Sequence, residues 1–461
     1  MSAPKPYQDR DSAIYALATP AAESALAVIR TSGQGVIERI AGCFSRPERL
    51  REAAGNTAVV GVFVDPDDGS HIDQVVCVVY RAPRSYTGED AVEISCHGSM
   101  PVVRSIVSVL EKAGLRPAER GEFTLRAFLA GKMGLTQAEA VAEIIRARTD
   151  TARSLALGRL EGRLDQEIER LKQDLVKVLA AVQIQLDYPE EETGEIAYDL
   201  ERLQRVTSEL RTLVSTYRSG RLYQAGVQVA LAGATNAGKS SLFNRMLRED
   251  RSIVSDTHGT TRDFIEANVE IAGIPVRLYD TAGLREIDES VEREGIRRTK
   301  EVIEQAAALV YLVDAGRGMD DGDRQAIGSF ADESACIRLW NKVDTIDEKN
   351  PHSVPEGFIP VSAETGEGMD RFRKELERVL TAEGVQLSGG ETVIDNERQA
   401  MLVQRAIEAA ERTAGSMQDL APADLVAVDL QDAVDALGEI TGEVTSEDIL
   451  DTMFGDFCVG K

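Results

Sequence analysis

The chain has 461 residues, of which 43% are hydrophobic and 28% charged, and its formal charge at pH 7 is −26. This length suggests two to four domains, and the composition excludes both a disordered chain and a small disulfide-stapled scaffold. The apolar runs are shorter than the ~20 residues of a membrane-spanning helix, and the polar N-terminus lacks a signal-peptide pattern. We therefore expect a cytoplasmic protein with no membrane segment. The five cysteines lack CxxC spacing, which predicts reduced thiols.

The negative charge is concentrated near the C-terminus, where residues 383–461 hold 4 basic and 17 acidic groups, a net charge of −13. A charge of this sign repels nucleic acids at long range, so any RNA contact has to be local. One run of arginines forms either a local cationic patch or, more simply, a solvated helix face that alternates with acids. These arginines are Arg146, Arg148, Arg153, Arg159, Arg163 and Arg170.

The first 128 residues read as an α+β domain. Short β-branched runs at 25–29, 75–80 and 91–95 predict strands, and residues 102–113 predict a helix. Glycine, proline and aspartate turn signals separate these segments. We therefore expect a domain over residues 1–128 in which strands and helices are mixed.

Helical segments precede and follow the middle of the chain. From residue 160 to 186 aliphatic side chains recur at steps of three and four, which predicts one long helix with a single apolar stripe. Pro189 ends this pattern before four full heptads, so a helix packed in a bundle of its own chain is favoured over a dimeric coiled coil. Residues 396–416 and 423–437 are also amphipathic. We expect an all-α domain in two parts, 129–220 and 383–461, interrupted by an inserted domain at 221–382.

The inserted segment alternates strands with helices. Buried-type apolar runs at 227–232, 274–279, 308–313 and 337–340 are each followed by a polar loop and a helix-forming stretch. This order predicts an α/β domain with a parallel sheet covered on both faces. Such sheets bind ligands beyond the carboxyl ends of their strands.

A phosphate-binding loop follows the first of these strands. Residues 233–240 read GATNAGKS, which fits the pattern GxxxxGK[ST]. Glycines allow backbone N–H groups to wrap a phosphate chain, Lys239 reaches the β- and γ-phosphates, and Ser240 ligates Mg²⁺. The helix that begins there directs its positive end at the anion.

Three further motifs occur in the order that a Ras-like GTPase requires. Thr260 and Thr261 lie in a loop where a threonine senses the γ-phosphate and Mg²⁺, and Asp280 opens a DTAG sequence that comes close to both. Asp344, in the sequence NKVD, accepts paired hydrogen bonds from guanine that adenine does not offer. The sequence at 362–364 resembles the loop that closes over guanine. The predicted GTP-binding residues are Asn236, Ala237, Gly238, Lys239, Ser240, Ser241, Ser255, Asp256, Thr257, His258, Gly259, Thr260, Thr261, Asp280, Thr281, Ala282, Gly283, Asn341, Lys342, Asp344, Ser362, Ala363 and Glu364.

The group that positions the attacking water is not evident from these motifs. Ras-like proteins use a glutamine directly after DxxG, but here Leu284 stands in that place, and an aliphatic side chain does not orient water. The catalytic group therefore comes from elsewhere. The acids that follow nearby are Glu286, Asp288, Glu289 and Glu292.

Together with stretches outside the inserted domain, these motifs resemble one family, the MnmE (TrmE) tRNA-modifying GTPases. The terminal CVGK and the TGED segment are the most specific of the matching stretches. In chain order these are SYTGEDAVE at 85–93, HG at 97–98, GEFTLRAFL at 121–129, QAEA at 137–140, NAGKSS at 236–241, GTTRD at 259–263, DTAGLRE at 280–286, ITGEV at 440–444 and FCVGK at 457–461.

The resemblance implies a function as well as a fold. The N-terminal domain would bind a tetrahydrofolate and form a homodimer, which the nucleotide state of the GTPase domains opens and closes. A heterotetramer with MnmG (GidA), which carries FAD, would build an aminomethyl or carboxymethylaminomethyl group on C5 of the wobble uridine of certain tRNAs.

The resemblance also assigns roles to residues. Arg30, Glu93, Lys132 and Lys461 would contact 5-formyl- or 5,10-methylene-tetrahydrofolate. Ser240 and Thr261 would ligate Mg²⁺. A potassium ion would take the place of an arginine finger between paired GTPase domains, and Glu292 would position water. The potassium ligands would be Asn236, Ser255, Thr257 and Thr260.

Cys458 lies four residues from the end, where its thiol is reachable. A free thiol beside a one-carbon carrier suggests a catalytic role, and a tail cysteine packed against the helices is the other interpretation. A second functional hypothesis is a regulatory or ribosome-assembly GTPase switch. Such a protein uses the same nucleotide motifs but needs neither a folate site nor Cys458.

Overall fold

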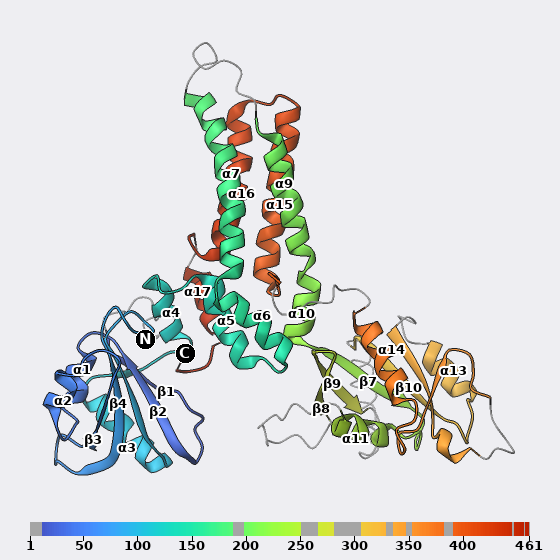
Figure 1. Ribbon diagram of the computed structural model, residues 1–461, viewed down its shortest axis with the longest axis horizontal. Helices are drawn as coiled ribbons and strands as arrows, with labels where there is room; N and C mark the ends of the chain where they lie inside the picture. Colours follow the sequence, from blue (N-terminus) through green and yellow to red (C-terminus); the bar gives the residue numbers. More distant parts are fainter. Residues whose placement is uncertain are drawn as a thin grey trace, which may run out of the picture. The chain divides into compact units, whose positions relative to one another are not determined.

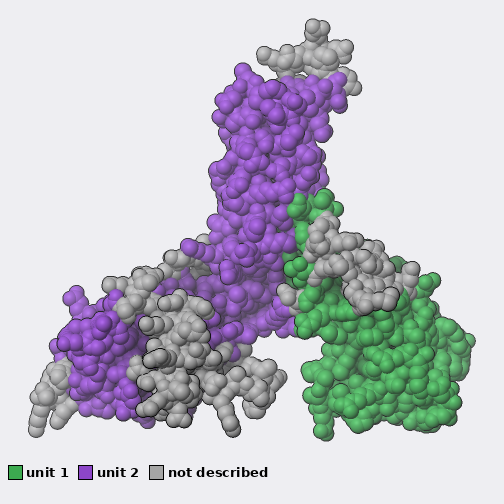
Figure 2. Space-filling view, turned by 180° about the vertical axis from the view of Figure 1, so that it is seen from behind, with its two compact units in different colours: residues 1–142, 160–169, 438–461 green, residues 143–159, 170–437 purple. Residues whose placement is uncertain are grey.

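The computed structural model describes residues 12–187, 198–249, 266–280, 306–328, 335–346, 353–381, 391–444, 447–455 and 457–460. The chain divides into two compact units (Figure 2). Unit 1 comprises residues 1–142, 160–169 and 438–461, and unit 2 comprises residues 143–159 and 170–437. The four-segment domain division expected from the sequence is a different partition and stays a prediction.

Unit 1 is built on a six-stranded sheet with the order β3-β4-β5-β2-β1-β6. Its pairs are antiparallel except β1 with β6. Helices α1 (Val36–Ala41), α2 (Pro47–Arg51) and α3 (Met100–Lys112) contribute to a core with one face of the sheet. The strands are β1 (Ile14–Leu17), β2 (Ser24–Ser32), β3 (Thr57–Val64), β4 (His71–Tyr80), β5 (Ala91–Gly98) and β6 (Arg116–Pro117). The expected α+β character of this region is confirmed.

Alternation along these strands separates the two faces of the sheet. Val75, Cys77 and Val79 of β4 are buried against the helices, whereas Val76 is exposed. This is the period-two pattern of a sheet that is covered on one side. The apolar residues Leu26, Val60 and Val76 lie exposed on strands of this sheet.

A second cluster of unit 1 joins distant parts of the chain. Helix α4 (Glu122–Leu129) and the start of α5 (Leu135–Arg146) pack with α17 (Glu447–Gly455) through Leu125, Leu135, Phe454 and Phe457. Beyond α17, Val459 forms a bridge with Arg120. The C-terminal tail is therefore mounted on α4 and the loop before it.

The long helices form a bundle, as Figure 1 shows for α7, α9, α15 and α16. Their bounds are α7 (Arg163–Asp187), α9 (Leu200–Ser215), α15 (Glu397–Gln418) and α16 (Ala423–Thr441). The stripe residues of α7 are buried within the single chain from Leu164 to Val182, so the bundle interpretation is confirmed. No helix among the described residues is both long and apolar enough to cross a membrane.

One helix expected from the sequence is two helices in the structure. The sequence predicts a single helix that starts at Leu160. In the structure Leu160 is the last residue of α6 (Asp150–Leu160), and α7 begins at Arg163. Gly162, with a φ of 82°, lies between them. A residue in the left-handed conformation interrupts the helical hydrogen bonds, and glycine adopts this conformation at the least cost.

The sheet of unit 2 has the order β12-β11-β10-β7-β9-β8. Its strands are β7 (Val227–Gly233), β8 (Glu266–Ile271), β9 (Ile274–Asp280), β10 (Ala308–Asp314), β11 (Cys336–Asn341) and β12 (Phe358–Val361). Its helices are α11 (Lys239–Glu249), α13 (Asp321–Gly328) and α14 (Met369–Thr381), and α10 (Tyr217–Ala225) leads into it. Buried residues occur on both sides of the sheet, in two separate clusters.

This sheet is parallel except for β8, which the sequence did not reveal. β8 pairs antiparallel with β9, and Ile271 faces Ile274 across a two-residue turn. Ala272 and Gly273 both have positive φ, 51° and 81°, as a type I′ hairpin turn requires. The predicted parallel sheet is thus correct for β7, β9, β10, β11 and β12 and wrong for the edge strand.

Candidate functional sites

The phosphate-binding loop lies between β7 and α11, at the carboxyl end of a central strand. Gly233 and Gly238 have φ values of 141° and 96°. A Cβ on Gly233 would lie 2.3 Å from the carbonyl oxygen of Leu312, and one on Gly238 would lie 2.1 Å from Nδ2 of Asn341. Only glycine therefore fits at both positions. Asn236 also takes a left-handed φ, 64°, which asparagine tolerates better than most residues.

Two side chains of this loop region are held by contacts that a phosphate and a metal would replace. The Lys239 ammonium donates to the carbonyl oxygens of Gly233 and Ala234 at 2.9 and 2.8 Å. The Ser240 hydroxyl donates to Asp280 Oδ2 at 2.9 Å. Ser240 lies in the first turn of α11 and Asp280 ends β9, so the fold brings together two oxygen groups suited to Mg²⁺.

Asn341 connects the phosphate-binding loop to the loop at 362–364. Its Nδ2 donates to the Ala237 carbonyl oxygen at 2.8 Å, and its Oδ1 accepts from the Ala363 N–H at 3.1 Å. The side chain is buried and joins two loops that are far apart in the sequence. Thr365 N–H donates to the buried hydroxyl of Ser362 at 3.0 Å, which fixes the 362–364 loop internally.

Asp344 follows β11 by three residues. It belongs to a single 3₁₀ turn, Val343–Thr345, and is exposed. Lys342 before it has a φ of 65° and contacts Asp314 Oδ2 at 2.7 Å. Partial burial by itself would raise the pKa of Asp314, but the Lys342 ammonium and the Gly316 N–H hold that pKa below its usual value.

A cavity of about 320 Å³ borders this region. Three predicted residues, Ser241, Ala363 and Glu364, line it together with Asn244, Arg245, Arg248 and Glu249 of α11. Sequence reasoning missed Arg245, which donates from Nε and Nη2 to the carbonyl oxygens of Ala363 and Glu364 at 2.6 and 2.5 Å. Its acceptors are backbone atoms 118 and 119 positions away, so no sequence pattern marks the contact.

Several predicted residues lie outside the described part of the chain. For the nucleotide site these are Ser255, Asp256, Thr257, His258, Gly259, Thr260, Thr261, Thr281, Ala282, Gly283 and Glu292, and for the folate site Lys461. Their assignments stay predictions.

A second cavity, also about 320 Å³, lies in unit 1. Arg30 of β2 and Glu93 of β5 are register partners, and Arg30 Nε contacts Glu93 Oε1 at 2.8 Å. Tyr80 donates to Glu93 Oε2 at 3.4 Å, and burial together with this carboxylate raises the pKa of Tyr80. The lining residues are Arg30, Thr31, Ser32, Tyr80, Tyr86, Thr87, Ala91, Glu93 and Phe123.

The C-terminal tail reaches this cavity. The Gly460 carbonyl oxygen accepts from Arg30 Nη1 at 3.4 Å, although 430 positions separate the two residues. Cys458 is exposed and free, and its carbonyl oxygen accepts from the Gly121 N–H at 3.5 Å. Lys132 does not line the cavity; its ammonium donates to the Pro83 carbonyl oxygen at 2.9 Å. The fold thus brings Arg30, Glu93 and the tail together and directs Lys132 to a neighbouring loop.

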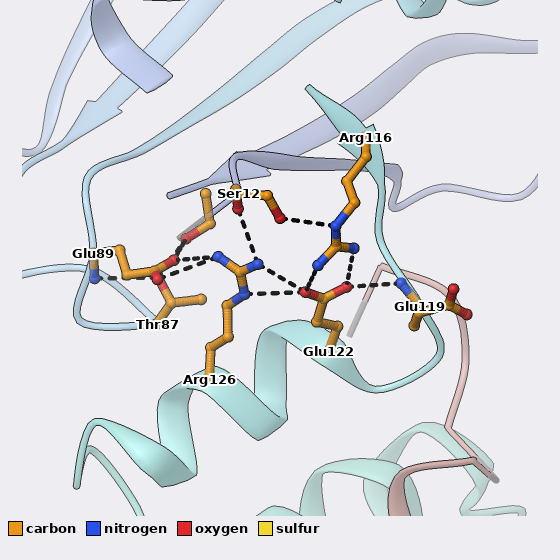
Figure 3. Close-up of polar contacts among 8 residues, drawn as sticks. Ser12, Thr87, Glu89, Arg116, Glu119, Glu122 and Arg126 are labelled. Atoms are coloured by element: carbon orange, nitrogen blue, oxygen red, sulfur yellow. Dashed lines mark hydrogen bonds and ion pairs between the residues drawn. The ribbon is translucent and has the colours of Figure 1, made fainter. Parts of the chain in front are cut away.

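Four charged side chains of unit 1 alternate in sign (Figure 3), and Glu89 at one end accepts a hydrogen bond at 2.6 Å from Ser32, which lines the cavity. Glu122 accepts from Arg116 Nη2 at 2.7 Å and from Arg126 Nη2 at 2.8 Å, and Arg126 Nη1 also contacts Glu89 Oε2 at 3.1 Å. Burial by itself would raise the pKa of Glu122, but hydrogen bonds from Arg116, the Glu119 N–H and Arg126 hold it below its usual value. We call Glu89, Arg126, Glu122 and Arg116 the buried charge network. Sequence reasoning gave these residues no role.

The arginine run between 146 and 170 is a solvated face only in part. Arg159 is 3% exposed and lies between Glu143 and Asp395, both at 2.5 Å. Arg148 donates to Asn268 Oδ1 at 3.1 Å, and Arg153 pairs with Asp150. These contacts leave little support for a cationic patch built from the run.

Comparison with known proteins gives matches along almost the whole chain. Residues 13–132 match the model of the "GTP-binding protein TrmE N-terminus", and residues 135–458 match the "MnmE helical domain". The tRNA modification GTPase MnmE of Borrelia recurrentis is 40% identical over 455 residues, which cover 97% of this chain and 98% of that protein. The protein of the same name from Treponema denticola is 41% identical over 463 residues, with the same coverage. Among solved structures, Aquifex aeolicus Era bound to GDP and AlF₄⁻ overlaps 40% of this chain and 66% of its own, with 24% identity and a TM-score of 0.28.

Proposed function

Because the chain belongs to the MnmE family of tRNA modification GTPases, we propose that it hydrolyses GTP to drive modification of the wobble uridine of certain tRNAs. With an FAD-bearing partner of the MnmG type, the product would be an aminomethyl or carboxymethylaminomethyl group on C5. The observation that carries the nucleotide part is the contact of Ser240 with Asp280 beside the wrapped loop at 233–238.

We propose a task for five described residues of the nucleotide site. Lys239 exchanges its two backbone acceptors for β- and γ-phosphate oxygens, and Ser240 with Asp280 holds Mg²⁺ directly or through water. Asn341 keeps the 362–364 loop against the phosphate loop, and the exposed Asp344 selects guanine.

The family's potassium site is proposed here for Asn236 together with Ser255, Thr257 and Thr260, and water positioning for Glu292. Support comes from Asn236, which is exposed and has a left-handed backbone conformation. A monovalent cation there would neutralise charge that develops between the phosphates. Hydrolysis in equimolar KCl and NaCl tests this, and equal rates would remove Asn236 from the metal ligands.

We propose that the cavity of unit 1 binds a reduced folate. Its acceptor Glu93, its cation Arg30 and the rings of Tyr80 and Tyr86 suit a flat heterocycle that carries both donor and acceptor edges. A tetrahydrofolate would supply the one-carbon unit, and the tail brings the exposed Cys458 to the same region. The Lys132 ammonium donates to the Pro83 carbonyl oxygen. It would contact the ligand only if this hydrogen bond were broken.

A homodimer is proposed through the uncovered face of the sheet of unit 1. Leu26, Val60 and Val76 are 61%, 49% and 39% exposed on strands of this sheet, and Val60 pairs directly with Val76. An exposed apolar face of this kind is a common protein interface. A second copy of the chain is the occupant that the family implies.

The test is a comparison of wobble-uridine nucleosides from cells that contain the wild-type chain, no chain, or a chain without residues 458–461. The proposal predicts loss of the modified nucleoside in the last two, with GTP hydrolysis retained by the truncated protein. Titration with 5-formyl-tetrahydrofolate separates this function from a ribosome-assembly switch. No binding at high micromolar ligand would favour the switch.

A further inference from the structure

Helix α4 contacts the cavity wall on one side and the C-terminal tail on the other. Toward the cavity, the hydroxyl of Thr124 lies 3.0 Å from that of Tyr86, and Arg126 binds both carboxylate oxygens of Glu89 at 3.2 and 3.1 Å. Tyr86 lines the cavity. The segment 85–90 is therefore held by α4 on one side and by Ser32 of β2 on the other, since the Ser32 hydroxyl contacts Thr87 and Glu89 at 2.7 and 2.6 Å.

Toward the tail, the first residue of α4 fixes the preceding loop. Glu122 Oε2 accepts from the Glu119 N–H at 2.9 Å. The next two residues of that loop bind the tail, Arg120 by its bridge to Val459 and Gly121 by its N–H to the Cys458 carbonyl oxygen. Gly121 has no room for a side chain, because a Cβ would lie 2.8 Å from the Phe454 carbonyl oxygen. The loop 117–121 and the tail are thus in close contact.

The buried charge network connects these two sides. Arg126 is 4% exposed and Glu122 is fully buried, so each charge has to keep its partners (Figure 3). Arg126 contacts both Glu89 and Glu122. Its Nη2 also donates to the Ser12 carbonyl oxygen at 3.0 Å. One buried guanidinium therefore joins Glu89 to Glu122, so a shift of Glu89 acts on Glu122 through Arg126.

We propose that Arg126 is a positioning residue that couples the cavity wall at 85–90 to the loop 117–121 and the tail that bears Cys458. By linkage, a ligand that orders one of these segments orders the other, and the docked tail strengthens binding in the cavity. The identity of the ligand, a reduced folate, rests on the proposed function. The coupling itself is a property of the free chain.

Hydrogen–deuterium exchange of the full-length protein without ligand tests the coupling. The variants are Glu89→Gln, which removes one charge at a partly exposed position, and Arg126→Lys, whose single ammonium does not bridge two carboxylates. Tyr15→Phe is the matched control, because it removes a hydrogen bond of the same unit, to Glu111 at 2.6 Å, outside the network. Thermal unfolding verifies that all variants fold.

We expect exchange to rise about threefold to tenfold in both 85–90 and 117–121, and in 447–455 and 457–460, for Glu89→Gln and Arg126→Lys but not for Tyr15→Phe. If exchange rose only in 85–90, or did not rise at all, the proposal would be overturned. Either result is what a purely local stabilising role of Arg126 predicts.

A second arm adds saturating 5-formyl-tetrahydrofolate. In the wild type, the ligand should slow exchange in the tail, and in Arg126→Lys most of that protection should be absent even at saturation. The direct contact of Arg30 with Gly460 predicts a small amount of remaining protection in both proteins. If the wild type did not bind the folate, the assignment of a reduced folate as the ligand would be wrong. The coupling would still be decided by the exchange measured without ligand.

Discussion

The two sites of this chain are held in place by different interactions. In the nucleotide site, Lys239, Asn341 and Arg245 direct their hydrogen bonds to backbone carbonyl oxygens and amides of nearby loops. Beside the cavity of unit 1, side chains of opposite charge hold one another around the buried Arg126 and Glu122. The first arrangement holds loops by their backbone groups, whereas the second is centred on charged side chains that also bind the Glu119 N–H and the Ser12 carbonyl oxygen.

This difference predicts different responses to substitution. A backbone-directed donor can be lost with little effect on the fold, because a carbonyl that it leaves near the surface is hydrated. A buried charge that loses its partner has no such replacement, so the fold itself is weakened. Changes in the nucleotide site should therefore affect function, and changes in the buried charge network should affect stability first.

The largest effect is expected for Glu122→Ala. The buried Arg126 and the partly exposed Arg116 would both lose a carboxylate partner, so the local free energy of unfolding of unit 1 should fall by about 3–5 kcal/mol. Native-state hydrogen exchange of β2 and β5 measures this. Glu119→Ala is the control, because its exposed side chain is removed while its N–H remains, and it should change stability by less than about 0.5 kcal/mol. Equal losses in the two variants would contradict the comparison.

For Lys239→Ala, we expect GTP hydrolysis to fall roughly 10²- to 10³-fold, since a charge that stabilises the transition state is lost. The circular dichroism spectrum should be unchanged, because the two carbonyl acceptors belong to a loop that glycine geometry already fixes. Phosphate release in potassium and magnesium buffer gives the rate. Lys374→Ala removes the same charge from an exposed position of α14 and should leave the rate unaffected.

Asp344→Asn should weaken GDP binding by about 2–3 kcal/mol, roughly 30- to 150-fold, because guanine donors would face an amide. Xanthine nucleotides should gain affinity in the same variant, since their extra carbonyl accepts from that amide. Competition titrations with both nucleotides measure the switch. If the variant kept the preference for guanine, Asp344 would not be the residue that recognises the base.

The smallest effect concerns pH. The pKa of Glu122 is below its usual value in the folded chain, so the folded state releases this proton more readily than the unfolded state. Its contribution to stability is therefore present above the unfolded pKa and is lost as the pH falls through the folded pKa. Stability of unit 1 should decline less steeply on acidification through and below the usual range of a glutamate pKa in Glu122→Gln than in the wild type. A parallel decline would show that other carboxylates dominate acid unfolding.

Local sequence was sufficient where a structure depends on neighbours along the chain. Periodicity and glycine placement act within a few residues, so they predicted the loop at 233–240, the helices α3, α15 and α16 and the strands β2, β4, β5, β7, β9, β10 and β11, but not β1, β3 or β6. The β8 hairpin was missed because its turn, Ala272-Gly273, is a weaker signal than Asn-Gly. The break between α6 and α7 was missed because Gly162 interrupts an otherwise continuous apolar stripe.

The sequence by itself determined a guanine-nucleotide site, since its motifs place the phosphate, metal and base groups on one sheet edge in a fixed order. Only the tertiary structure decided what surrounds each site. Arg245 reaches the 362–364 loop, Arg126 joins Glu89 to Glu122, and Gly460 meets Arg30 across 430 positions. These pairings depend on which surfaces the folded chain brings together, and long-range contacts of single side chains leave no periodic trace in a sequence.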